Sequence, residues 1–113
     1  MESLPRKVLC DLLRDYGRDL MSDSRLKGLL MDYCGSCRAE VHLLVQAQQA
    51  GIPERQWKDS QRLPVGDVVA QLSAHLQTDY FVAEAAARWA VETWALALGL
   101  ELPTPAPPAA PLP

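Results

Sequence analysis

The segment from Val82 to Leu98 constrains the fold of this chain more than any other part of the sequence. Its polar residues Glu84, Arg88 and Glu92 are four residues apart, which places them on one stripe of an α-helix and lets both glutamates pair with the arginine. Most of its other positions carry alanine, tryptophan, valine or leucine. A helix that is apolar around so much of its circumference is usually buried by several neighbours. We therefore predict that this segment is the central helix of the fold.

The rest of the chain up to residue 102 follows the same 3.6-residue apolar period, and no stretch alternates apolar and polar residues as a strand does. We therefore predict an all-α fold, a compact bundle of five to six helices. In chain order, the expected helix limits are Ser3 to Gly17, Ser22 or Asp23 to Gly35, Ser36 to Gly51, and a fourth helix that opens at Pro64. Residues 18–22 are expected to form a short joint, and residues 53–63 a loop with a single helical turn.

The large aromatic residues divide into core and surface candidates. Trp89 and Trp94 lie in the apolar C-terminal segment and are expected in the core. Tyr16 and Tyr33 fall on the apolar stripes of the first two expected helices. Trp57 stands among polar residues, so it is the best candidate for an exposed interface anchor.

A proline-rich stretch follows the helical part of the chain. Residues 103–113 contain 6 of the 9 prolines. Because proline lacks a backbone N–H and fixes φ, we expect an extended polyproline spacer. Two interpretations stay open, a plain linker and a PxxP ligand for an aromatic groove, although no arginine or lysine flanks it. The expected organisation is a helical domain at residues 1–102 and a disordered linker at residues 103–113.

Length and charge restrict the classes of partner. A chain of 113 residues has room for one domain. The formal net charge is −3, so nothing in the total favours phosphate backbones or anionic lipid, and we expect no nucleic-acid partner. The distribution is uneven, because residues 1–66 hold 10 basic and 9 acidic side chains whereas residues 67–113 hold 1 basic and 5 acidic ones.

The apolar runs are all short. The first residues lack the apolar core and cleavage site of a signal peptide, and no run approaches the length that spans a bilayer. The sequence therefore predicts a cytoplasmic protein without membrane contact. Three cysteines are an odd number, which is not the pattern of a disulfide scaffold.

Cys34 and Cys37 form a Cys-x-x-Cys motif, a spacing that suits a redox disulfide or half of a tetrahedral zinc site. Zinc needs four ligands, and Cys10, His42 and His75 would have to converge from other helices to complete them. A thioredoxin-like motif follows a strand, and no strand is expected. We expect no metal site, with Cys34 as a core residue, while a redox- or metal-responsive switch remains the alternative.

No pattern of catalytic residues occurs. His42 and His75 have no serine or cysteine at a spacing that indicates a nucleophile and its base. A glycine-rich phosphate loop is absent from the sequence, and no acidic pair stands out from helical surface charge. We therefore expect no catalytic residue, no cofactor and no enzymatic activity.

The first expected helix and the joint after it carry charges of alternating sign. These residues are Lys7, Asp11, Arg14, Asp15, Arg18 and Asp19. They form either a solvated helix face or a docking surface whose mixed charge selects partners. Arg14, Asp15, Arg18 and Asp19, together with Trp57, are the candidate interaction residues.

The last helical segment also carries a family resemblance. Residues 86–99 read Ala-Ala-Arg-Trp-Ala-Val-Glu-Thr-Trp-Ala-Leu-Ala-Leu-Gly, with Arg88, Trp89, Glu92, Trp94 and Gly99 as the motif residues. This string resembles the closing motif of a small all-helical domain, of the adaptor or effector-associated type, that recurs in multidomain bacterial signalling and defence proteins. Earlier positions agree with it, namely Tyr16-Gly17, Leu20, Asp23, Leu29 to Asp32, Arg38, Glu40, Leu43 to Val45 and Ala47. The similarity covers about residues 4–100.

The resemblance implies no enzymatic activity. In that family the domain is attached to kinase-, chaperone-, protease- or formylglycine-enzyme-like modules, and it brings its host protein to a partner that carries a like domain. It also implies a death-domain-like architecture of six helices. The expected function is therefore non-catalytic recruitment, by self-association or by binding a like helical domain. A redox- or metal-responsive switch and a purely structural extension of the host are the alternatives.

Overall fold

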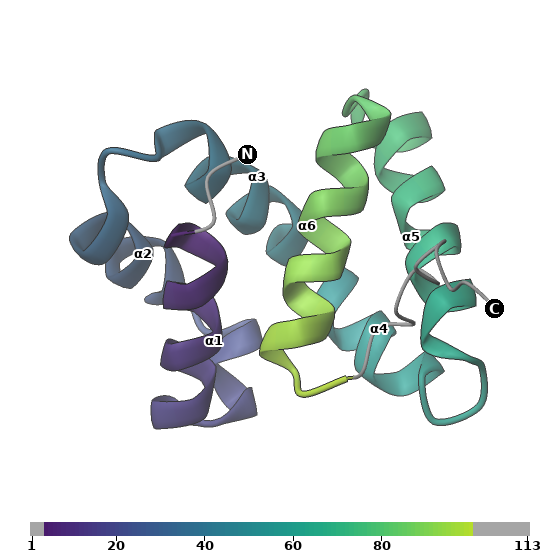
Figure 1. The fold of residues 1–113 in the computed structure, drawn as a ribbon, viewed down its shortest axis with the longest axis horizontal. Helices are drawn as coiled ribbons and strands as arrows, with labels where there is room; N and C mark the ends of the chain where they lie inside the picture. Colours follow the sequence, from purple (N-terminus) through teal and green to yellow (C-terminus); the bar gives the residue numbers. More distant parts are fainter. Residues whose placement is uncertain (1–3, 101–113) are drawn as a thin grey trace, which may run out of the picture.

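The computed structural model describes residues 4–100, which form six α-helices and one 3₁₀ helix with no strands among them (Figure 1). In chain order these are α1 (Leu4–Tyr16), η1 (Arg18–Ser22), α2 (Leu26–Cys34), α3 (Arg38–Gln49), α4 (Ile52–Asp59), α5 (Val65–Tyr80) and α6 (Glu84–Ala97). The predicted all-α bundle is confirmed. Ser3, the limit at residue 102 and the proline-rich segment 103–113 lie outside the described residues. None of the helices between residues 4 and 100 is long and apolar enough to cross a membrane.

Helix α6 is the centre of the bundle. It packs against α1, α3, α4 and α5, and Figure 1 shows it between α1 on one side and α5 on the other. Trp94 is fully buried on its inner face, and the small side chains beside it allow close approach of the neighbouring helices. The fully buried small residues of this helix are Ala87, Ala90, Val91, Thr93 and Ala95.

Side-chain hydrogen bonds tie α6 to three of its neighbours. The indole Nε1–H of Trp94 donates to the Leu44 carbonyl of α3 at 3.1 Å. The buried Gln56 amide of α4 donates to the Val91 carbonyl at 3.1 Å. The Arg6 guanidinium of α1 donates to the Thr93 hydroxyl at 3.0 Å. Because each bond fixes a direction, these contacts set the register of α6 in a way that apolar packing alone does not.

The end of α6 confirms the predicted stop at Gly99. This glycine has a φ of 81°, a left-handed conformation that glycine adopts without steric cost. Its N–H donates to the Leu96 carbonyl at 3.0 Å, and the N–H of Leu100 donates to the Ala95 carbonyl at 2.9 Å. These two bonds form a Schellman motif, which satisfies carbonyls that a helix end leaves open.

The segment predicted as a loop at residues 53–63 contains a helix instead. Helix α4 spans Ile52–Asp59, with Pro53 in its first turn and with Ile52, Pro53 and Gln56 buried. Gly51 does end α3 in a left-handed conformation, but the chain turns there directly into α4. Since proline presets the helical φ, Pro53 starts the next helix as well as stopping the previous one. Trp57 therefore lies on a helix.

We predict that truncating Trp94 destabilises the whole fold. Trp94→Ala removes the largest fully buried side chain among residues 4–100 together with its hydrogen bond to the Leu44 carbonyl, so the free energy of unfolding should fall by about 3–5 kcal/mol. Leu96→Ala, on the same helix but 37% exposed, is the control and should cost less than about 1.5 kcal/mol. Urea denaturation followed by circular dichroism measures both. Equal losses for the two variants would contradict the central position of Trp94.

Candidate interaction surface

The predicted charged residues of the first helix lie on its exposed side. The Arg14 guanidinium is 3.4 Å from a carboxylate oxygen of Asp11 and 3.4 Å from one of Asp15. Because Arg14 and Asp15 are exposed, each pair contributes at most about 1 kcal/mol to stability. The pairs therefore matter as a surface pattern of alternating charge, and they do not hold the fold together.

Two tyrosines stand beside these charges and enclose a groove between α1 and α2. Tyr16 is 54% exposed and Tyr33 is 62% exposed, although both were predicted on apolar core-facing stripes. The groove has a volume of about 290 Å³. We call it the tyrosine groove, and its lining residues are Val8, Asp11, Leu12, Arg14, Asp15, Tyr16 and Tyr33.

Arg18 and Trp57, both predicted for interaction, contact each other. The Arg18 guanidinium lies over the Trp57 ring at 4.0 Å from its centroid, a cation–π contact between η1 and α4. Trp57 is half-buried and packs against the core, so it is less exposed than predicted. Asp19, in the same turn of η1, is exposed. Arg14 and Asp15 thus line the tyrosine groove, whereas Arg18 and Trp57 form a separate contact.

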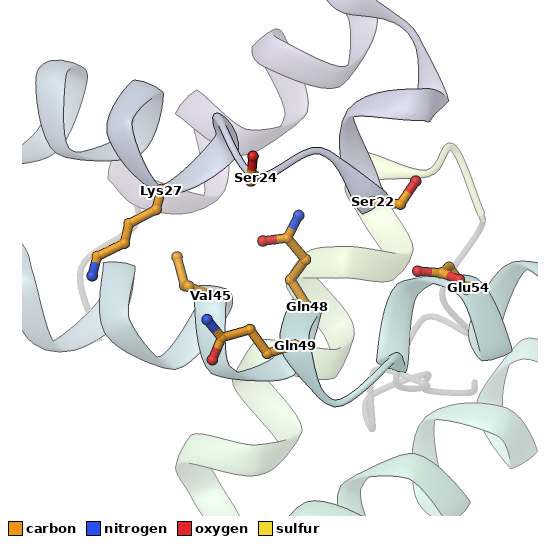
Figure 2. Close-up of a pocket in the computed structure, with 7 residues that line it drawn as sticks. All are labelled: Ser22, Ser24, Lys27, Val45, Gln48, Gln49 and Glu54. Atoms are coloured by element: carbon orange, nitrogen blue, oxygen red, sulfur yellow. The ribbon is translucent and has the colours of Figure 1, made fainter.

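A polar pocket lies where η1, α2 and α3 meet. Its volume is about 280 Å³. Figure 2 shows its lining residues Ser22, Ser24, Lys27, Val45, Gln48, Gln49 and Glu54. The Gln48 amide donates to the Asp23 carbonyl at 2.9 Å and so anchors the turn before α2. The Asp23 carboxylate accepts hydrogen bonds from the side chain and the backbone N–H of Arg25, which hold the pKa of Asp23 below its ordinary range. Hydrogen bonds thus hold the turn that borders the pocket.

A third groove lies between α2 and α3 and carries positive charge. It has a volume of about 240 Å³, and Lys27 and Val45 also belong to the polar pocket beside it. Neither Lys27 nor Arg38 has an ion pair within residues 4–100. We call it the basic groove, and its lining residues are Lys27, Met31, Arg38, Val41, His42 and Val45.

The motif residues Arg88, Trp89, Glu92 and Trp94 lie on α6 and have structural roles. The Arg88 guanidinium donates to the Glu92 carboxylate at 3.2 Å on the exposed side of α6, while Glu84 has no ion pair in the described part of the chain. Trp89 was predicted in the core but is half-buried, and the Arg6 guanidinium lies over its ring at 5.6 Å from the centroid. The motif therefore maintains the central helix and contributes little to the grooves.

The Cys-x-x-Cys motif lies at the turn from α2 to α3, with both cysteines free and buried. The Cys34 Sγ is 3.1 Å from the Leu30 carbonyl. Burial raises the pKa of the Cys34 thiol above its ordinary value, with smaller contributions from the nearby Cys37 and Glu40. Within residues 4–100, no three His, Cys, Asp or Glu side chains are grouped so that they could hold a metal ion. The arrangement favours a neutral thiol in the core over a reactive thiolate.

Comparison with protein-family models, with curated proteins and with solved structures finds no match to this chain. The predicted kinship with effector-associated domains and the death-domain-like architecture therefore stay predictions. We therefore interpret the grooves from their lining residues alone.

We predict that Cys34 reacts slowly with thiol reagents in the folded protein. Cys34 is 2% exposed and the pKa of its thiol is raised, so little accessible thiolate exists near neutral pH. In a Cys10→Ser/Cys37→Ser variant, the alkylation rate near pH 7 should be at least about tenfold lower in the folded protein than in the same protein in urea. The rate in the folded protein should rise as the pH is raised, because more of the thiol then ionises. Equal rates in the two states would show that Cys34 is a reactive cysteine.

Proposed function

We propose that this chain is a non-catalytic protein–protein interaction domain. It recruits its host, a larger bacterial signalling or defence protein in the cytoplasm, to a partner protein that carries a like helical domain. The resemblance of residues 86–99 to effector-associated domains supplies the class of host. The exposed residues of the tyrosine groove supply the structural support for this function.

The observation that carries the proposal is the tyrosine groove. Tyr16 and Tyr33 leave more than half of their surface in water, on a fold whose other large apolar side chains are mostly buried. Tyrosine is enriched in protein interfaces because its rigid ring buries a large area at a low cost in conformational entropy. The surrounding pattern of Arg14, Asp11 and Asp15 adds charges that discriminate between partners. An apolar groove with a polar rim is the usual anatomy of an interaction site.

The direct test measures binding between this chain and like helical domains. The preys are other helical domains of its organism that contain the Trp-Ala-Val-Glu-x-Trp-Ala string. We expect wild-type protein to bind at least one of them with a Kd of about 10 µM or tighter. Tyr16→Ser/Tyr33→Ser should weaken that binding at least about 30-fold, since central aromatic anchors carry most of the binding energy.

The control is Leu96→Ser, which changes an exposed apolar residue that lines none of the three grooves. It should bind as wild type does. Circular dichroism confirms that all variants are folded. Unchanged binding by the tyrosine variant, or the absence of binding to every prey at about 100 µM, would refute the proposed function.

A further inference from the structure

The turn between α5 and α6 holds an aromatic side chain in an unusual position. Phe81 is 90% exposed, and its φ of 56° makes it the one non-glycine residue with a positive φ among residues 4–100. A left-handed conformation is costly for a bulky residue, and such positions usually carry glycine or asparagine. The exposed ring packs on nothing that would offset this cost. The fold needs the conformation at position 81, but it does not need a phenylalanine there.

The surroundings of Phe81 are acidic. Asp79 precedes it at the end of α5, and Glu84 follows it in the first turn of α6. Asp79 pairs with His75 at 2.9 Å, while Glu84 has no ion pair within the described residues. Tyr80 beside it is 39% exposed and stacks edge-on with the His75 ring. The turn is thus an exposed aromatic tip between two carboxylates, and we call it the acidic tip.

The basic groove has complementary properties. Met31, Val41 and Val45 line it with apolar surface, and Lys27 and Arg38 supply positive charge that no carboxylate within residues 4–100 pairs with. Its volume of about 240 Å³ is large enough for one aromatic ring, since an apolar cavity of about 150 Å³ already binds benzene. The groove therefore suits an aromatic side chain flanked by carboxylates.

The acidic tip does not fill the groove of its own molecule. The exposure of Phe81 shows that its ring touches almost nothing in this fold. In Figure 1 the α5–α6 turn is at the top of the view, α2 is at the left edge, and α6 packs against both α5 and α3. The tip and the groove are therefore separate surfaces, each free to meet its complement on another molecule.

We propose that the domain associates head to tail with further copies of itself, the acidic tip of one copy entering the basic groove of the next. Phe81 fills the apolar floor, while Asp79 and Glu84 face Lys27 and Arg38. This inference goes beyond the proposed function, because it adds a self-contact through surfaces other than the tyrosine groove, and its partner is a second copy of the chain. Because the two surfaces differ, the contact is heterologous, and it continues into open oligomers unless the rotation between copies closes a ring.

Charge reversal tests the proposal. One variant carries Lys27→Glu/Arg38→Glu in the groove, and the other carries Asp79→Lys/Glu84→Lys in the tip. Each alone places like charges at the contact, so sedimentation velocity should show monomers where wild type associates. In an equimolar mixture, the unaltered tip of the first meets the unaltered groove of the second, and the two reversed surfaces also match. The mixture should recover association. Arg55→Glu/Lys58→Glu on α4 makes the same charge change away from the grooves and should associate as wild type does.

Removal of the aromatic ring of Phe81 is the second test of the head-to-tail contact. Phe81→Gly should raise the Kd for association at least about 30-fold, while the midpoint of thermal unfolding stays the same or rises because glycine relieves the left-handed strain. Wild-type protein that stays monomeric at millimolar concentration, a mixture that stays monomeric, or a Phe81→Gly protein that associates normally would overturn the proposal. Association lost in the tyrosine-groove variant but kept in all the tip and groove variants would leave the proposed function standing and refute this contact alone.

Discussion

The burial of Trp94 is the interaction on which the rest of the structure depends. Its ring lies in the centre of the bundle, and its indole N–H is satisfied by a carbonyl of α3, so the residue fixes both the depth and the register of α6. The alanines beside it have no side chains long enough to keep the other helices apart. Four helices therefore pack directly around α6, and the hydrogen bonds from Arg6 and Gln56 attach α1 and α4 to the same helix. The fold is therefore organised around one helix, which keeps one exposed side.

This arrangement decides which surfaces remain for function. Because α6 occupies the centre, α2 packs mainly on α1 and α3 at the edge of the bundle, and grooves form on both of its sides. The α5–α6 turn lies at the N-terminal end of α6, and Phe81 is exposed there. The hydrogen bonds that attach α1, α3 and α4 to α6 involve neither the exposed tyrosines nor the acidic tip, nor the basic residues Lys27 and Arg38, which have no ion pair within residues 4–100. Association through them leaves the core unchanged.

The sequence predicted the fold better than the surfaces. The near-uniform apolar character of residues 82–98 was enough to identify the central helix, and Gly17, Gly51 and Gly99 have the positive φ expected at helix ends. Helix α4 was predicted only as a loop with a single helical turn, because Trp57 stands among polar residues there. The exposure of Tyr33 was missed because the buried positions of α2, Leu26, Leu30 and Cys34, form a narrower stripe than the apolar pattern indicates. The basic groove unites residues from two helices, and the strain at Phe81 is a backbone property, so neither has a signal in the sequence.

The most direct test of the account is an NMR dilution series on the ¹⁵N-labelled protein, from millimolar to micromolar concentration. The account predicts that amide shifts move in two separate patches as copies dissociate, one in α2 and α3 around Lys27 and Arg38 and one around Phe81, while the amides near Trp94 stay fixed. The two patches should titrate with a single Kd, since each is one half of the same contact. Shifts confined to one patch, spread through the core, or absent over the whole series would contradict it.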